Sequence, residues 1–450
     1  MTIADLAPRI ASGKVSPTDI VRRCLARIDA RKELRAFITV LGDRAITDAD
    51  VAAREIAAGR YRGPLHGIPV SIKDLIAVAG VPTTSGSAVP PLHPAEDAPV
   101  VRRLREAGAI IIGKTNLHEF AFGTTGDETA FGAVHHPLDY ARSAGGSSSG
   151  AAVALAEGMC LASIGTDTGG SIRIPAAACG IVGLKPAYGE LPCDGVVPLS
   201  TTCDHVGPMT LSVEDARLVF EVLKGHSPST KSTDDERPLT FGVPSGYLTE
   251  RLDPEIRETL LRVRRRLASD GHAVLDVEIQ DSQWAPDVYL QIVLPEASQY
   301  HAPTLESDPS GYSPGVRLRL EMGRYLLAED YVRAMHLRTQ LTARVEDALG
   351  TCDVLLLPTL PIVAPLLGSP TVDVDGRPEP VRAATLRLTQ LFNLTGHPAL
   401  ALPAGANSAG LPISMQLVAR HNQTERLLTI AASVERQIAD GFGSVGGGAG

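Results

Sequence analysis

The stretch from Gly145 to Pro186 limits what this chain of 450 residues can fold into more than any other segment. Three consecutive serines, residues 147–149, follow two glycines, and Ser171 follows another glycine pair. Glycine is needed where the backbone takes a positive φ or closely approaches another group. Between the two serine clusters lies an alanine-rich run, residues 151–157, which predicts a helix. Serines placed beside free backbone N–H groups are typical of acyl-transfer sites.

Alternating strand and helix signals along the chain indicate an α/β architecture. Short apolar runs that predict strands occur at residues 65–74, 109–112, 205–210, 240–243, 274–277, 353–358 and 400–403. Patterns that predict helices occur at residues 16–28, 43–58, 97–108, 213–223, 254–269 and 422–438. Residues 1–60 are predicted to be helical and to pack on the core.

Two segments lack these signals. Residues 280–330 lose clear periodicity and are rich in Pro, Ser and Tyr, so we expect an irregular, variable segment that shapes the mouth of a substrate site. Residues 441–450 are rich in glycine and are predicted to be a flexible tail. The part of the chain before the tail, residues 1–440, is expected to form one large domain.

Composition and charge exclude several classes of protein. Hydrophobic residues make up 44% of the chain and charged residues 21%, as in ordinary globular proteins. The formal net charge of −9 argues against binding to nucleic acid or anionic membranes, and no apolar run is long enough to span a bilayer. The N-terminus has no apolar signal core, and the six cysteines form no C-x-x-C pair. We therefore expect a cytoplasmic protein with reduced thiols, no metal site and no cofactor.

Four other kinds of site fit the sequence poorly. A phosphate-binding loop needs G-x-x-x-x-G-K-[ST], but Lys185 is followed by proline. The pattern S-x-x-K fails because only one residue separates Ser71 from Lys73. The elbow G-x-S-x-G matches at Ser148 in its letters, but no strand signal precedes it and no downstream histidine stands out. The zinc motif H-E-x-x-H is absent.

Lys73 stands at the end of an apolar run that predicts a buried strand. Burying a charged ammonium is costly, so this lysine must be paired, exposed or deprotonated. From the residues alone two interpretations stay open, a functional lysine and a structural ion-pair partner.

The segment GGSSSG, followed by TDTGGSIRIPAAACGIVGLKP, resembles the signature of the amidase signature family. Ser147 and Ser171 are 24 residues apart, and a lysine lies upstream in GIPVSIKD. The resemblance extends to GKTN at residues 113–116, to LPTLP at residues 357–361 and to NLTGHPALALPAG near the C-terminus. It covers nearly the whole chain and implies one large domain with a mixed β-sheet core covered by helices on both faces.

The resemblance also implies a Ser–cis-Ser–Lys triad. Ser171 would be the nucleophile, Ser147 would follow a cis peptide bond and relay protons, and Lys73 would be the base. The backbone N–H groups that would form the oxyanion hole belong to Thr168, Gly169, Gly170 and Ser171. Losing one such donor typically slows catalysis by about 10²–10³-fold.

Other residues of the motif would support this triad. Asp167 and Arg173 flank the nucleophile and are expected to position it, and Ser148 is expected to hold its loop and hydrogen-bond near the lysine. Ser149 stands where the family more usually has glycine, and Ala144 where proline is common. Both departures leave the triad intact.

The substrate is less determined by the sequence. By resemblance, the acyl-binding channel would be bordered by Phe120, Ala121, Phe122, Gly123, Thr124 and Thr125. Ile174, next to Arg173, is apolar and argues against a short charged acyl group.

We therefore expect a serine hydrolase that cleaves C–N bonds of small apolar or aryl amides or carbamates through an acyl-enzyme, with esterase activity on the side. The alternative is an amidotransferase subunit that releases ammonia from glutamine within a tRNA-dependent transamidation complex. The expected partner is a small-molecule amide or carbamate, and a homodimer is left open as the oligomeric state.

Overall fold

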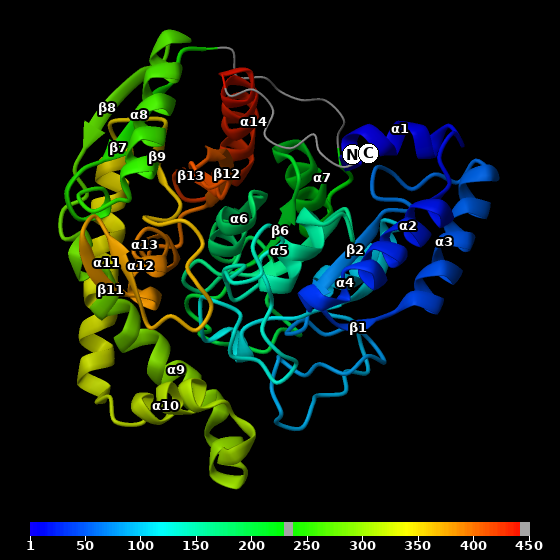
Figure 1. Cartoon of the computed structure of the whole chain (residues 1–450), viewed down its shortest axis with the longest axis horizontal. Coiled ribbons are helices and arrows are strands. Elements are labelled where there is room, and N and C mark those ends of the chain that lie inside the picture. Colours follow the sequence, from blue (N-terminus) through cyan, green and yellow to red (C-terminus); the bar gives the residue numbers. More distant parts are fainter. Residues whose placement is uncertain (229–236, 442–450) are drawn as a thin grey trace.

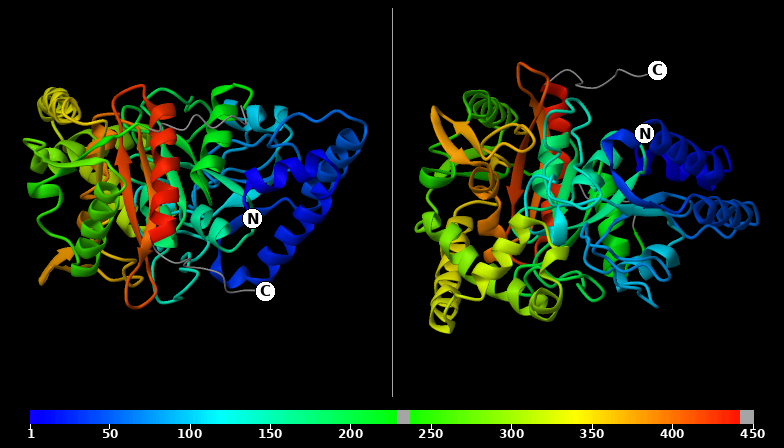
Figure 2. Two further views of the ribbon diagram at one scale, coloured as in Figure 1. Left: turned by 90° about the horizontal axis from the view of Figure 1, so that it is seen from above. Right: turned by 60° about the horizontal axis from the view of Figure 1, so that its bottom comes forward.

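The computed structural model describes residues 1–228 and 237–441, and within these residues eleven strands form one mixed β-sheet (Figure 1). The order of the strands across the sheet is β1-β3-β2-β4-β6-β5-β12-β13-β9-β7-β8. Their bounds are β1 (Phe37–Val40), β2 (Pro69–Lys73), β3 (Ile110–Thr115), β4 (Ala162–Thr166), β5 (Val182–Lys185), β6 (Val206–Thr210), β7 (Thr240–Pro244), β8 (Ala273–Val277), β9 (Val354–Pro358), β12 (Ala399–Ala406) and β13 (Pro412–Val418). A separate hairpin pairs β10 (Thr371–Val374) with β11 (Arg377–Pro380). The N-terminal strands and the pair β7–β8 lie at opposite ends of the molecule, blue and green in Figure 2.

Helices flank this sheet. Their bounds are α1 (Ile3–Ala11), α2 (Pro17–Ala30), α3 (Gly42–Ala57), α4 (Pro99–Glu106), α5 (Ser149–Ala156), α6 (Arg173–Cys179), α7 (Val213–Lys224), α8 (Pro254–Ser269), α9 (Ala285–Ser307), α10 (Pro314–Gly323), α11 (Ala328–Leu349), α12 (Val381–Leu386), α13 (Gln390–Leu394) and α14 (Thr424–Gly441). Helices α5 and α6 pack on each other and on β4, β5, β12 and β13, whereas α7 and α14 pack on each other and on β6 and β12. This arrangement is the predicted α/β domain with a mixed sheet covered by helices.

The N-terminal segment is helical with one exception. Helices α1, α2 and α3 occupy most of the first 60 residues, but the short strand β1 lies between α2 and α3. It pairs antiparallel with β3, and Phe37 faces Thr115 across the ladder. Edge pairing with an existing strand explains why this apolar run, FITV, does not continue as helix.

The prediction of an irregular segment at residues 280–330 is wrong, because α9 and α10 occupy most of it. Pro295 and Pro303 lie inside α9, and a proline inside a helix costs about 3 kcal/mol. Packing of α9 on α10, α11 and α13 offsets this cost through buried side chains such as Val288 and Ile292. The proline content therefore hid a helix that tertiary contacts stabilise.

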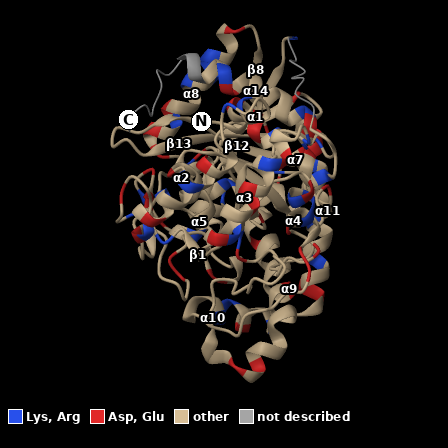
Figure 3. Cartoon of the chain, turned by 90° about the vertical axis from the view of Figure 1, so that its right-hand side faces the viewer, with Lys and Arg blue, Asp and Glu red and all other residues tan. Residues whose placement is uncertain are grey.

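Other expectations concern the surface and the ends of the chain. None of the described helices has the length and apolar character needed to cross a bilayer. Basic and acidic residues, blue and red in Figure 3, are interspersed along the chain. The six cysteines are free thiols. The predicted tail, residues 441–450, lies outside the described residues apart from Gly441.

Candidate active site

Lys73 and Thr166 end two neighbouring strands, β2 and β4. Because these strands run parallel, their carboxyl ends meet at the same edge of the sheet and bring the two side chains together. The Lys73 Nζ lies 2.8 Å from Thr166 Oγ1 and 2.7 Å from Ser147 Oγ, and the lysine is fully buried. No carboxylate of the described residues forms an ion pair with it. Of the two interpretations of Lys73, the structural ion pair does not apply.

The electrostatic environment of Lys73 favours a neutral amine. Burial lowers the pKa of the Lys73 ammonium to about 7, although the carboxylates of Asp167 and Asp204 act in the opposite direction. A neutral amine can accept a proton, which an ammonium cannot. Near neutral pH, the lysine is therefore present in both protonation states.

The Ser147 loop has the conformation that the resemblance implies, since the peptide bond between Gly146 and Ser147 is cis. Ser147 is fully buried, and its carbonyl accepts a hydrogen bond from the His118 N–H at 3.1 Å. A Cβ on Gly146 would lie 2.9 Å from backbone atoms of Thr124 and Thr125. Glycine is therefore required at this close approach of two loops.

The loop of residues 168–171 joins β4 to α6, and its four backbone N–H groups donate no hydrogen bond to any described residue. The loop is held by its other groups. Thr168 Oγ1 lies 2.5 Å from Asp204 Oδ1, and Thr389 Oγ1 lies 2.6 Å from the Gly169 carbonyl oxygen. Gly170 has a φ of 138°, a conformation that L side chains rarely adopt. Because buried N–H groups are nearly always paired, these four N–H groups without a protein acceptor are available to a ligand.

The two serine loops are joined through their backbones. The Ser148 N–H donates to the Ser171 carbonyl at 3.1 Å, and the Ser148 Oγ donates to the Thr166 carbonyl at 3.3 Å. The Ser171 hydroxyl makes no hydrogen bond to another described residue, so its direct contact with Ser147 is not formed here. Ser148 holds the loop as expected, but it does not hydrogen-bond to Lys73 itself. Catalytic hydrogen bonds are often long before substrate binds and tighten in the complex.

Asp167 and Arg173 form a fully buried ion pair beside the Ser171 loop. Arg173 Nη2 lies 3.0 Å from Asp167 Oδ1, and its Nε lies 3.1 Å from Oδ2. Burial alone would raise the pKa of Asp167, but the Arg173 guanidinium outweighs it and holds that pKa well below its usual range. Arg173 also contacts Asn393 Oδ1 at 2.7 Å and Gln416 Oε1 at 3.1 Å. The sequence did not reveal these two partners, which come from α13 and β13.

The predicted substrate loop, residues 120–125, is anchored to helices distant in sequence. The Phe120 ring lies 4.4 Å from the His301 ring of α9, measured between centroids. Thr385 Oγ1 of α12 lies 2.9 Å from Thr124 Oγ1. The loop reaches the Ser147 loop through its backbone near Thr124, and none of its side chains hydrogen-bonds to the predicted triad.

Phe122, in the middle of this loop, is buried beside two guanidinium groups. Arg319 lies 5.4 Å and Arg382 lies 5.9 Å from the centroid of its ring. Arg319 also pairs with Glu128 at 2.7 Å, whereas Arg382 has no ion-pair partner among the described residues. Ala121 is buried beside Phe122, and Gly123 packs on His118, where a Cβ would clash.

Side chains of mixed character pack against the glycines of the Ser171 loop, and Thr389 Oγ1 is the atom nearest to a Cβ on Gly170. A Cβ on Gly169 would lie 2.6 Å from Tyr289 Oη and 3.0 Å from Leu386 Cδ2. A Cβ on Gly170 would lie 2.7 Å from Ile174 Cδ1, and Ile174 itself is buried. Tyr289 and Leu386 come from α9 and α12 and carry no local signal in the sequence. Residues 280–330 therefore contribute to this site through a helix.

Comparisons with known proteins agree with the fold and with the motifs. The sequence model of the Amidase family matches residues 19–428. An amidase of Pseudomonas putida is 38% identical and covers 91% of this chain and 90% of its own length. A crystal structure of an amidase superposes with a TM-score of 0.92 at 38% identity, covering 97% of this chain and 100% of the other. A glutamyl-tRNA(Gln) amidotransferase subunit of Anaeromyxobacter dehalogenans is 37% identical over 95% of this chain and 94% of its own length. The chain therefore belongs to the amidase signature family of amide-hydrolysing enzymes.

Proposed function

We propose that this enzyme cleaves the C–N bond of small amides through an acyl-enzyme, with Ser171 as nucleophile, Ser147 as proton relay and Lys73 as base. The observation that carries the proposal is the environment of Lys73. It is buried without a carboxylate partner, its Nζ lies 2.7 Å from Ser147 Oγ, and burial brings its pKa to about 7. A base with a pKa near the working pH is best suited to accept a proton and return it.

In the acylation step, Ser171 Oγ attacks the substrate carbonyl carbon. Its proton passes to Ser147 Oγ while the Ser147 proton passes to Lys73 Nζ, so the relay serine stays neutral. The tetrahedral intermediate then collapses as the lysine returns a proton through Ser147 to the leaving nitrogen. The C–N bond breaks, the amine departs, and the acyl group stays on Ser171. Water attacks this ester through the same relay and releases the acid.

The four free N–H groups of residues 168–171 would stabilise the oxyanion. Asp204 accepts a hydrogen bond from the Thr168 hydroxyl, and the Thr389 hydroxyl donates one to the Gly169 carbonyl. These two contacts fix the loop, so its amides are oriented before the reaction begins. The Asp167–Arg173 pair and Ser148 would act as positioning residues, because they fix the two serine loops without touching the hydroxyls that react.

The substrate we propose is a small amide or carbamate with an apolar or aryl acyl group. Leu386 and Ile174 pack against the glycines of the Ser171 loop and offer only hydrocarbon, beside the hydroxyls of Tyr289 and Thr389. Aryl and alkyl groups gain free energy from such contacts, whereas a charged group loses hydration there. Carbamates and esters present the same carbonyl to the nucleophile.

A second candidate function is ammonia release from glutamine within a transamidation complex. The 37% identity to an amidotransferase subunit favours it. Glutamine carries an ammonium and a carboxylate that need charged partners. The hydrocarbon side chains of Leu386 and Ile174 beside Gly169 and Gly170 favour the first function.

A rate panel with the purified chain alone tests the proposal. The panel holds matched amide, anilide, carbamate and ester substrates with one aryl acyl group, together with glutamine. We expect turnover of the aryl substrates and a loss of about 10³-fold or more in Ser171→Ala. Ser149→Ala is the matched control, since this neighbouring serine is buried and its hydroxyl has no hydrogen-bond partner. Activity on glutamine only, or full activity of Ser171→Ala, would contradict the proposal.

A further inference from the structure

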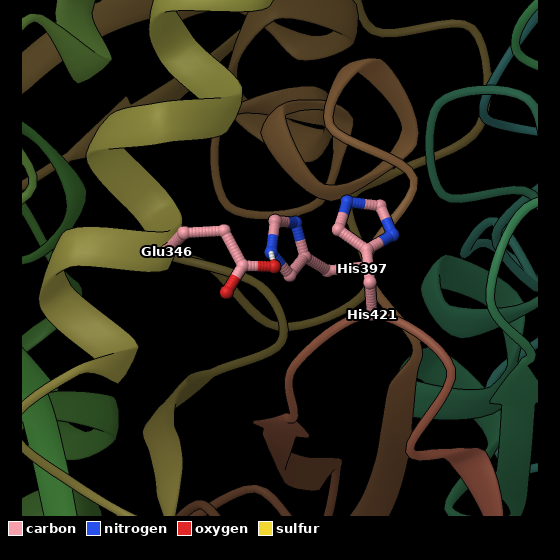
Figure 4. Close-up of side chains that lie close together, drawn as sticks. All are labelled: Glu346, His397 and His421. Carbon is pink, nitrogen blue, oxygen red and sulfur yellow. Dashed lines mark hydrogen bonds and ion pairs between the residues drawn. The ribbon is translucent and has the colours of Figure 1, made fainter.

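Two histidines and a glutamate meet outside the group formed by Lys73 and the serines (Figure 4). Glu346 lies near the end of α11, His397 just before β12 and His421 just after β13. The start of β12 pairs with the end of β13, which brings the two histidines to the same end of that strand pair. One nitrogen or oxygen atom from each of the three side chains lies within 4.8 Å of the other two.

Thr395 holds the His397 ring from one side. Its Oγ1 lies 2.8 Å from His397 Nδ1. His397 Nε2 faces the cluster and lies 2.9 Å from Glu346 Oε1. Histidines that bind metals typically have one ring nitrogen held by such an outer partner while the other binds the ion.

The contact between His397 and Glu346 can hold either a proton or a cation. Without one of them, the Nε2 and Oε1 lone pairs would face each other at 2.9 Å. The Thr395 hydroxyl can donate to Nδ1 or accept from it, so it satisfies the ring in either tautomer. One tautomer donates from Nε2 to the carboxylate, and the other leaves the Nε2 lone pair free for a metal.

We propose that Glu346, His397 and His421 bind a divalent transition-metal ion, with Zn²⁺ as the best-fitting ion. Two imidazoles and one carboxylate are a known zinc ligand set, with water in the fourth position. Glu346 and His421 are partly exposed, so the ion and the water have access. At metal–ligand distances of about 2.1 Å the donor atoms of a tetrahedral site lie about 3.4 Å apart, so the partly exposed side chains of Glu346 and His421 would have to rotate to bind the ion.

The ion would link α11 to the loops beside the paired strands β12 and β13, and would stabilise the folded chain. The ion takes no part in the reaction proposed for Ser171, so each of the two proposals can be tested without the other. The proposal differs from the expectation of no metal site that the lack of zinc motifs suggested.

Isothermal titration of untagged, chelator-treated full chain with ZnCl₂ tests the proposal. We expect one saturable ion per chain and a rise in Tm of about 3 °C at an excess of 100 over Kd. Glu346→Gln and His421→Ala should each weaken Zn²⁺ binding by about 10-fold or more. His336→Ala is the matched control, because this exposed histidine also lies on α11 and should leave the affinity unchanged.

The spectrum of bound Co²⁺ gives a second readout that does not depend on stability. Four-coordinate Co²⁺ should give visible absorption in the wild type that Glu346→Gln loses while its fold, followed by circular dichroism, is retained. Absence of saturable Zn²⁺ binding in the wild type would overturn the proposal. Equal affinity in the wild type and both variants would also overturn it, since the ion would then sit elsewhere.

Discussion

Replacing Lys73 by methionine should change how the stability of the protein depends on pH. The lysine is buried with a pKa of about 7, whereas its ordinary value is 10.5. Between these two values the unfolded chain binds a proton that the native chain has released, so native stability rises as pH rises. The free-energy cost of burying the Lys73 ammonium therefore applies in full below pH 7 and decreases as the pH rises toward 10.5. Methionine has a similar length and does not titrate.

The size of this change in stability follows from the shift in the pKa of Lys73. One pKa unit corresponds to about 1.36 kcal/mol, so between pH 7 and pH 10 the wild type should gain about 4 kcal/mol relative to Lys73→Met. The variant also leaves the hydroxyls of Ser147 and Thr166 without their lysine partner, at about 1–3 kcal/mol each. That loss lowers the free energy of unfolding of Lys73→Met by the same amount at every pH. It therefore does not change how the difference between the two proteins varies with pH.

Urea unfolding of both proteins from pH 6 to pH 10 measures this difference. Lys14→Met is the matched control, because Lys14 is exposed, and its free energy of unfolding should follow the wild type at every pH. We expect the difference between wild type and Lys73→Met to be constant below pH 7 and to move in favour of the wild type above it. A difference that stays constant up to pH 10 would refute a lowered pKa for Lys73.

Three further predictions address the site. Ser147→Ala should lower kcat by about 10²–10⁴-fold through loss of the relay, and a rate within threefold of the wild type in steady-state assays would argue against that role. The wild-type kcat/KM should rise as Lys73 loses its proton around pH 7 and then level off, so a profile that is flat from pH 5 to pH 9 would count against a lysine base. Arg173→Met should destabilise the fold by about 3–5 kcal/mol in urea unfolding, since it leaves Asp167 buried without its partner, and a loss below 1 kcal/mol would contradict this expectation.

Features with a strong local signal could be predicted from the sequence. The helix predicted at residues 254–269 is α8, which begins with the N-cap Asp253 followed by proline. The apolar run predicts Lys73 near the end of a buried strand, and Lys73 is the last residue of β2. In each case residues adjacent in the sequence determine the conformation, so the local sequence pattern is enough to predict the element.

Features that depend on distant contacts could not be predicted. Helix α9 carries internal prolines, which argue against a helix locally and are outweighed by packing on three other helices. Tyr289 and Leu386 reach Gly169 from segments far along the chain, and no spacing rule connects them. The cluster of Glu346, His397 and His421 carries no sequence signal for the same reason, since its members come from three separate segments.

The central claim is that the acyl group is transferred to Ser171. Acid-quenching the enzyme during turnover of an activated aryl ester, followed by intact-mass measurement and peptide mapping, tests it most directly. We predict a mass increase of one acyl group on Ser171 that is absent in Ser171→Ala. An acyl group found on Ser147, on Ser148 or on any other side chain would contradict the assignment of the nucleophile.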